Sequence, residues 1–376
     1  MNRGRWYPSA LTLPDGRVLC LSGSDGKAAG NKFEPNNNIP QIYTETPSPN
    51  SWVEVADAFE TTQRKLMLDL YPRLHIDPTN GQVFMVGPKP DSWFLELKEA
   101  NGTEIKSSSG VVGRWIDAGT KRTAGARDYA PSVMYDSGKI MHIGGGADRI
   151  TASNVTEFID LNKTAKWDSE TAKLKTARKQ FNATVLPDGT VLVNGGTSGP
   201  GFNDLVADKD GKNGPVKTTE LMNPSVEPRQ WIEMAKESMS RCYHSIALLL
   251  RDGRVLSAGG GEAGGIPAKE CHTEGQLFEL PYLCKGPRPT ILSAPSVIEY
   301  GKEFSVTVGT NDLIGKISLV RLGSVTHCCN MNQSLVFLDG LRQDGPKLTI
   351  QAPSNPNVAP PGHYMLFVLN SAGNCR

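Results

Sequence analysis

Three separate segments of the chain carry histidine and tyrosine side chains that could bind a metal together. Tyr243 and His244 are neighbours, His327 lies far downstream, and Tyr7 lies near the start. Two imidazoles and two phenols form a donor set that suits Cu(II), which takes nitrogen and oxygen ligands in square-planar or tetragonal geometry. The sequence therefore predicts a mononuclear copper site built from Tyr7, Tyr243, His244 and His327.

The same residues also allow a purely structural interpretation. Side chains alternate between the two faces of a regular strand, so adjacent Tyr243 and His244 can reach one metal only from a bend or a loop. Cys328 and Cys329 follow His327, but neighbouring side chains of a strand point apart, and we expect neither thiol to be a ligand. Four further histidines are expected to be structural or surface residues, namely His75, His142, His272 and His363.

Length, charge and hydropathy exclude several classes of partner. The chain has 376 residues, 38% of them hydrophobic, and 40 basic against 39 acidic residues give a net charge of +1. Such a balance creates no field that would attract nucleic acid or an anionic membrane. No segment approaches the roughly 20 apolar residues that span a bilayer. We therefore expect a small-molecule site, with neither nucleic acid nor a membrane as partner.

Five segments share one β-hairpin pattern, which indicates repeated blades. Each has an apolar run, a turn that ends in glycine, a second apolar run and then another glycine. Glycine suits these turns because it tolerates positive φ. The turns are Asp15-Gly16, Asn80-Gly81, Ser137-Gly138, Asp188-Gly189 and Asp252-Gly253.

A single tryptophan recurs in each of the first four units, at Trp52, Trp115, Trp167 and Trp231. A hairpin, a glycine pair and one tryptophan at a period of about 50 residues are typical of a kelch-type β-propeller. The sequence thus predicts an all-β chain in which residues 1–286 form a propeller with five visible blades.

From about Pro287 the pattern changes to alternating strands separated by polar turns, which predicts an immunoglobulin-like β-sandwich at 287–376. The expected strands are 303–309, 316–322, 334–338, 347–352 and 363–369. His327 then lies on a turn of this sandwich. To meet Tyr243 and His244, the sandwich must send a loop into the axial channel of the propeller.

These motifs resemble the copper radical oxidases, the family of galactose oxidase and glyoxal oxidase. The resemblance covers nearly the whole chain and rests on Arg5-Trp6-Tyr7-Pro8, on Tyr243-His244-Ser245, on Thr326-His327 with Asn330-Met331-Asn332-Gln333, and on a closing strand at 360–367. Arg5-Trp6-Tyr7 and Leu70-Tyr71-Pro72 are closer to the glyoxal oxidase branch. The resemblance implies a seven-bladed propeller followed by the sandwich.

The resemblance also implies a role for each site residue. Tyr7 would be the equatorial phenolate that holds a radical, and Tyr243 the axial phenol that takes the substrate proton. His244 and His327 would be the equatorial imidazoles. The implied reaction oxidises a small aldehyde or primary alcohol with O2 and yields H2O2. Phe181-Asn182 and Tyr129 open inner strands like Tyr7, so we expect them to line the channel mouth.

Three features depart from the family pattern. The family links its radical tyrosine to an upstream cysteine, whereas no cysteine precedes Tyr7 in these 376 residues. Only five blades are visible and the sandwich ends early, so the chain is expected to be truncated at both ends, with missing blades or a partner chain closing the propeller. Asp25 stands where galactose oxidase has an indole over the radical site.

The sequence therefore allows two functions. One is a copper radical oxidase; the other is a truncated propeller that binds copper or a partner without turnover. No signal peptide is visible in this span. Asn-x-Ser/Thr sequons nevertheless favour a secreted protein, and they occur at Asn101, Asn154, Asn162, Asn182 and Asn332.

Overall fold

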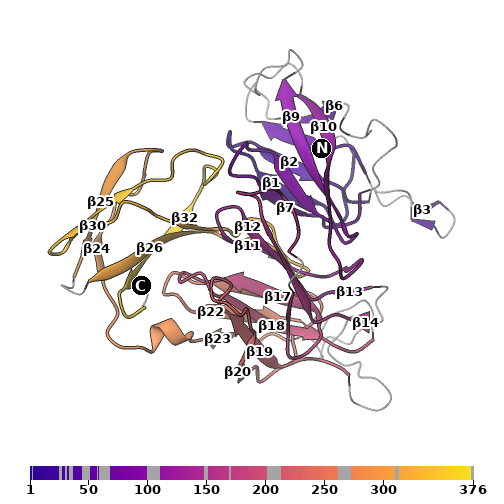
Figure 1. The fold of residues 1–376 in the computed structure, drawn as a ribbon. Helices are drawn as coiled ribbons and strands as arrows, with labels where there is room; N and C mark the ends of the chain where they lie inside the picture. Colours follow the sequence, from indigo (N-terminus) through magenta and orange to yellow (C-terminus); the bar gives the residue numbers. More distant parts are fainter. Residues whose placement is uncertain are drawn as a thin grey trace.

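A computed structural model describes residues 1, 3–24, 28–29, 32–33, 37–44, 51–56, 58, 68–99, 111–147, 151–168, 171–200, 213–260, 272–309 and 313–373. Within these ranges the regular structure consists of β-strands and one short 3-10 turn at Pro281–Leu283 (Figure 1). None of them holds a helix long and apolar enough to cross a membrane. The all-β prediction is confirmed.

The five predicted hairpins form the inner strand pairs of five antiparallel blades. Each blade adds outer strands to its hairpin. The inner pairs are β1 (Ser9–Thr12) with β2 (Val18–Leu21), β7 (Arg73–Ile76) with β8 (Val83–Val86), β11 (Ser132–Asp136) with β12 (Lys139–Ile143), β17 (Lys179–Val185) with β18 (Val191–Thr197), and β21 (Ser245–Leu249) with β22 (Val255–Gly259).

The outer strands join some blades and complete others. The first blade adds β5 (Gln41–Thr44) and β6 (Ser51–Ala56), and the second adds β9 (Asp91–Glu99) and β10 (Val111–Lys121). These two blades are continuous, because β6 pairs in parallel with β10. The later blades add β15 (Val155–Asp160) with β16 (Ala172–Lys173), β19 (Thr218–Met222) with β20 (Ile232–Lys236), and β23 (Gln276–Phe278). Figure 1 shows the first two blades in indigo to purple and the later ones in magenta to salmon.

The repeated tryptophans link neighbouring blades. Trp167 pairs with Ile159 of the third blade through an isolated β-bridge. Its indole Nε1 donates to Ser92 Oγ of the second blade at 2.9 Å. Trp231, in the fourth blade, donates in the same way to Thr156 Oγ1 of the third blade at 3.0 Å. Both indoles are almost fully buried. The tryptophan period of the sequence therefore marks contacts between blades.

The C-terminal part forms the predicted two-layer sandwich, drawn in orange to yellow in Figure 1. One sheet contains β24 (Ile291–Ser293), β25 (Glu303–Val308), β31 (Lys347–Gln351) and β30 (Arg342–Asp344). The other contains β29 (Leu335–Phe337), β26 (Ile314–Arg321) and β32 (Tyr364–Asn370). Their inward residues, among them Val306, Leu348 and Val368, form one buried core. A propeller followed by a sandwich is confirmed, while a boundary at residue 287 stays a prediction.

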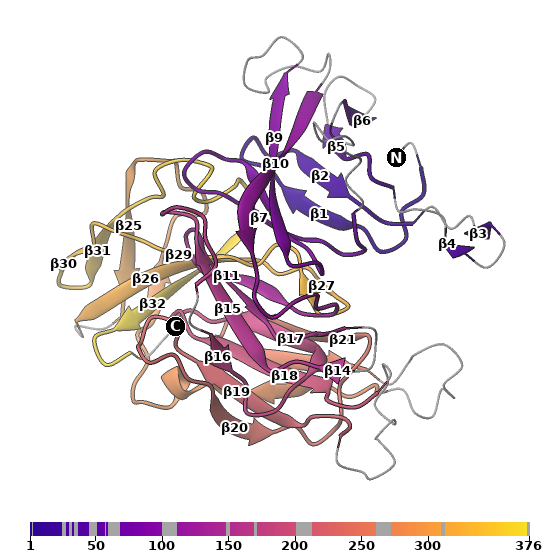
Figure 2. The ribbon, with the colours of Figure 1, turned by 45° about the vertical axis from the view of Figure 1, so that its right-hand side comes forward.

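The segment that carries His327 runs from the sandwich to the inner strands of the propeller. It begins with a small hairpin, β27 (Val325–Thr326) with β28 (Cys329–Asn330), which lies close to β21 in Figure 2. Gln333 then accepts from Val185 N at 3.0 Å and donates to Ala183 O at 2.7 Å, both in β17. The predicted intrusion of a sandwich loop into the propeller is confirmed.

Candidate copper site

One position in every blade has a left-handed backbone. It lies just before or at the start of the inner strand, and its φ is positive although the residue is not glycine. Such a conformation is uncommon outside glycine and persists only where the surroundings hold it. The five residues are Tyr7 (φ 63°), Tyr71 (48°), Tyr129 (48°), Gln180 (58°) and His244 (64°). This bend removes the strand-alternation objection, since Tyr243 and His244 do not sit on a regular strand.

Arginines two or three residues before four of these bends bind carbonyl oxygens of the same blade. Arg5 donates from Nη1 to the carbonyl oxygen of Ser22 at 2.7 Å and from Nη2 to that of Ile39 at 2.5 Å. Arg241 is fully buried and donates from Nη1 to the carbonyl oxygen of Gly259 at 2.7 Å. Arg127 and Arg178 make the corresponding contacts in their blades. Sequence reasoning missed this set, although an arginine stands 11 or 12 residues before the turn glycine in four of the five units.

His327 sits at the tip of the β27–β28 hairpin. His327 (φ 49°) and Cys328 (φ 63°) are its two turn residues, and two successive positive φ values define a type I′ turn. Such turns usually contain asparagine and glycine, so this pair is unusual. The turn holds the imidazole out from the sandwich toward the propeller, as the sequence predicted. Cys328 and Cys329 are buried behind it.

The four residues that the sequence predicted as ligands meet at one point. Nε2 of His244 and Nε2 of His327 lie 2.9 Å apart, and the hydroxyls of Tyr7 and Tyr243 hydrogen-bond each other. The ring of Tyr7 lies 4.4 Å from that of His327, and the ring of Tyr243 lies 3.9 Å from that of His244. His244 is exposed, whereas the other three are half-buried. The cluster thus opens to solvent on the side of His244.

The local environment keeps His327 neutral. Burial, together with the nearby His244, lowers the pKa of His327 to about 4. Only the neutral imidazole has a lone pair for a metal. Its Nδ1 lies 2.6 Å from Thr326 Oγ1 and 3.0 Å from Tyr71 OH. Either hydroxyl can accept an Nδ1 proton, and that tautomer leaves the Nε2 lone pair facing His244.

This donor set fits copper. Two imidazole nitrogens with bonds of about 2.0 Å to one ion at a right angle would stand about 2.8 Å apart, close to the 2.9 Å observed. Two phenol oxygens lie beside them, and nitrogen with oxygen donors is the set that Cu(II) prefers. Among the described residues no group of three histidines, cysteines or carboxylates could hold a metal. The fit therefore depends on the tyrosines.

Aromatic rings surround the candidate ligands. Trp6 stacks on Tyr7 with ring centroids 3.7 Å apart and 17° between planes, and about half of its side chain is exposed. Tyr71 also stacks on Tyr7, at 4.7 Å, and Tyr129 lies 6.3 Å from Tyr243. Burial raises the pKa of Tyr71 and of Tyr129 well above the usual range. The indole that covers the ring of Tyr7 therefore belongs to Trp6, the residue before it in the chain. Asp25, which was expected at the position of the galactose oxidase indole, lies outside the described residues.

The expected position equivalent to Tyr7 in the fourth blade, Phe181-Asn182, is wrong by one residue. Phe181 does not line the channel, because it is fully buried in the core that the later blades share. Asn182 is buried and donates to Ser245 Oγ at 3.0 Å, so its sequon is not accessible for a glycan. The residue equivalent to Tyr7 in this blade is Gln180, whose side-chain amide is buried and has no hydrogen-bond partner among the described residues. The left-handed bend causes the shift, since it breaks the alternation of the strand.

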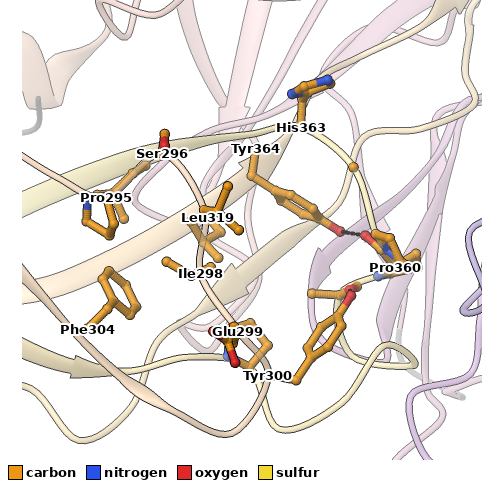
Figure 3. A pocket seen from close by; sticks show the side chains of 16 residues that line it. Pro295, Ser296, Ile298, Glu299, Tyr300, Phe304, Leu319, Pro360, His363 and Tyr364 are labelled. Carbon is orange, nitrogen blue, oxygen red and sulfur yellow. Dashed lines mark hydrogen bonds between the residues drawn. The ribbon is translucent and has the colours of Figure 1, made fainter.

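Three of the four histidines expected to be structural or exposed have surroundings that fit this expectation. His75 is buried and its Nε2 lies 2.8 Å from Ser132 Oγ, and His142 is also buried. His363 is exposed on the sandwich beside a hollow of about 390 Å³ (Figure 3). Aromatic and proline side chains such as Phe304, Tyr364 and Pro295 line this hollow, and it contains none of the four candidate ligands.

Comparison with known proteins gives the same relationship over the whole chain. Residues 288–375 match the family model "Galactose oxidase-like, Early set domain". A galactose oxidase of Gibberella zeae is 31% identical over 402 residues, which cover 99% of this chain and 53% of that protein. The aldehyde oxidase GLOX of Vitis pseudoreticulata is 25% identical and covers 98% of this chain and 70% of its own length. The chain spans about half the length of the galactose oxidase that it matches.

A solved structure extends the comparison to the fold. It is a fungal alcohol oxidase described as having catalytic diversity among the AA5 family and determined in complex with copper. It superposes with a TM-score of 0.82 at 27% identity, covering all of this chain and 75% of its own. The resemblance read from the motifs is therefore confirmed: this chain is a homologue of galactose oxidase and of the glyoxal or aldehyde oxidases.

Proposed function

We propose that the protein is a copper-dependent oxidase that converts a small primary alcohol or a hydrated aldehyde with O2, yielding H2O2. The overall reaction balances as RCH2OH + O2 → RCHO + H2O2, or as RCH(OH)2 + O2 → RCOOH + H2O2. His244, His327, Tyr7 and Tyr243 would hold one copper ion. A bound copper would supply an open position for the substrate oxygen and accept one electron.

The side chains of this site supply the other half of the chemistry. The substrate loses two electrons and two protons, and copper takes only one electron. Tyr7 would hold the second oxidising equivalent as a phenoxyl radical and take the hydrogen atom from the substrate carbon. Tyr243 would accept the proton of the substrate hydroxyl, as a general base placed beside the reacting oxygen. Trp6 covers the ring of Tyr7 and keeps water from one face of it.

The observation that carries the proposal is the convergence of these four side chains from three distant parts of the chain, with two Nε2 atoms 2.9 Å apart. The relatives support the same class of reaction, since they include a galactose oxidase, an aldehyde oxidase and a copper-bound alcohol oxidase. The half-buried phenols and the exposed His244 leave a side of the site open for a small substrate.

Three finer statements belong to the same proposal. The substrate is a small alcohol or aldehyde, and neither nucleic acid nor a membrane is a partner. The protein acts outside the cell. A cysteine joined to Tyr7 and further blades, or a partner chain that closes the propeller, would complete the enzyme. Each remains part of the proposal.

The test is to load the purified chain with Cu(II), oxidise it mildly, and record its optical spectrum, its EPR spectrum and its peroxide production on methylglyoxal and galactose. An oxidase predicts intense visible absorption, loss of the Cu(II) EPR signal and peroxide with at least one substrate. Stoichiometric copper with an ordinary Cu(II) signal and no peroxide would instead support the second reading, a propeller that binds copper without turnover. Failure to bind copper would refute the oxidase and the copper-binding propeller, and would leave a propeller that binds a partner without turnover.

A further inference from the structure

Tyr71 contacts two of the four candidate ligands at once. Its hydroxyl lies 3.0 Å from Nδ1 of His327, and its ring stacks on Tyr7 with centroids 4.7 Å apart and 25° between planes. Tyr71 is itself equivalent to Tyr7 in the second blade and is 7% exposed. It is therefore placed to act on both the nitrogen and the oxygen side of the site without being a ligand.

The backbone of Tyr71 is held tightly. Its φ of 48° is left-handed, and its N–H donates to the carbonyl oxygen of Tyr7 at 3.1 Å. Its own carbonyl accepts from the guanidinium of Arg73, which is buried and also donates from Nε to Ala130 O at 2.9 Å. A strained conformation persists only when such contacts determine it fully. These contacts fix the backbone from which the phenol side chain of Tyr71 extends.

The hydroxyl of Tyr71 can set the tautomer of His327 by accepting a proton from its Nδ1. A neutral imidazole carries one proton, on Nδ1 or on Nε2. An acceptor at Nδ1 draws the proton there and leaves the Nε2 lone pair directed at Nε2 of His244, 2.9 Å away. Thr326 Oγ1, at 2.6 Å from Nδ1, is a second acceptor. Both hydroxyls contact the same nitrogen, so Thr326, Tyr71 and His327 form one network.

The ring contact acts on Tyr7. Offset stacking of two aromatic rings contributes about 0.5–1.5 kcal/mol beyond area burial and restricts the ring orientation. Tyr71 stacks on Tyr7 and also lies 5.1 Å from the ring of His327. A movement of Tyr71 would consequently displace both candidate ligands together.

We propose that Tyr71 is a positioning residue: it fixes the Nδ1–H tautomer of His327 and holds the ring of Tyr7 against it, so that the nitrogen and oxygen donors face one point. This inference deepens the proposed function and rests on it. Partners that orient a metal-binding histidine change metal affinity about 10- to 100-fold when they are lost.

The experiment compares wild type with Tyr71→Phe, which removes the hydroxyl and keeps the stacked ring, and with Thr326→Val. Tyr300→Phe is the matched control, because its hydroxyl donates to a backbone carbonyl of the sandwich, that of Ala359. Cu(II) dissociation constants come from competition titration, and the tautomer of His327 comes from ¹⁵N NMR of the metal-free protein. Tyr71→Phe is expected to weaken copper binding about 10- to 100-fold and to shift His327 toward the Nε2–H tautomer. Tyr300→Phe is expected to change neither.

Two results would overturn the inference. One is an unchanged tautomer and copper affinity in Tyr71→Phe with a loss only in Thr326→Val, which would assign the role to Thr326 alone. The other is an equal loss in Tyr300→Phe. The NMR readout needs no metal, so it decides the role of Tyr71 even if wild type binds no copper, a result that would refute the proposed function instead.

Discussion

Nε2 of His244 and Nε2 of His327 lie 2.9 Å apart, although the first belongs to the fifth blade and the second to a turn of the sandwich. Neither backbone is regular at this point, since both residues have positive φ. Two unprotonated nitrogens at this distance repel each other unless a proton or a cation lies between them. Without a metal, a proton between the two nitrogens joins them in a hydrogen bond. With copper bound, both lone pairs would bind the ion, as the proposed function requires.

Replacing either histidine should remove high-affinity copper binding. We expect His244→Ala and His327→Ala each to weaken Cu(II) binding by at least about 100-fold, beyond the 10- to 100-fold typical of outer partners. His363→Ala is the matched control, because that histidine is exposed on the sandwich. Equal copper affinity in all three variants and wild type, measured by competition with a chelator, would show that the site lies elsewhere.

Tyr243→Phe should separate binding from turnover. The substitution removes a phenol oxygen that the proposed mechanism uses as a general base, a role worth about 10²- to 10⁴-fold in rate. The two imidazoles remain, so we expect copper affinity to fall much less than kcat. Steady-state peroxide formation and copper titration on the same samples measure both. A kcat equal to that of wild type would contradict the assigned role of Tyr243.

Buried histidines should make the fold sensitive to mild acid. Burial lowers the pKa of His75 to about 3, from about 6.5 in the unfolded chain. Between these values the unfolded chain binds a proton that the folded protein does not, so stability is full above pH 6.5 and falls as the pH drops toward 3. From pH 7 to pH 5 this single group costs about 2 kcal/mol. Burial also lowers the pKa of His142, which adds to the slope.

Urea unfolding at pH 7 and pH 5 tests this expectation. His75→Gln should reduce the loss of unfolding free energy between the two pH values by about 2 kcal/mol, whatever its effect at pH 7. His363→Gln should leave the loss unchanged, since that ring is exposed. A pH dependence identical in wild type and His75→Gln would disprove the buried neutral state of His75.

The contact between Trp231 and Thr156 should contribute to the cohesion of neighbouring blades. Thr156→Val removes the acceptor of a buried indole N–H, which costs about 1–3 kcal/mol. Trp231→Phe should destabilise the protein as well, and in a double-mutant cycle the two changes should be less than additive. Thermal unfolding of the four proteins gives the coupling. Strict additivity would mean that the hydrogen bond does not link the blades.

The sequence predicted the features that local patterns encode. Turn glycines such as Gly16 and Gly253 specify hairpins, and the recurrent tryptophans mark blades, so the architecture followed from periodicity. The four candidate ligands were found because their motifs are distinctive. Conversely, the expectation for Phe181 was wrong by one position, because the left-handed backbone of Gln180 reverses the alternation of side chains along the strand. Glutamine does not usually adopt this conformation, so the residue type does not predict the bend.

The sequence could not predict the contacts that depend on these bends or that join distant segments. Trp6 is adjacent to Tyr7 in the chain, and adjacent residues of a regular strand do not stack. The stack exists because Tyr7 has a positive φ. Tyr71 was recognised as part of a motif, but its contact with His327 joins residues 256 positions apart. Only the packed blades and the inserted sandwich loop bring them together.

The proposed copper site is tested most directly by the EPR spectrum of the protein loaded with one equivalent of Cu(II), recorded for wild type, His244→Ala and His327→Ala. We expect nitrogen superhyperfine splitting from two imidazoles in wild type and from one in each variant. The same nitrogen pattern in all three proteins, or none in wild type, would contradict a copper site formed by His244 and His327.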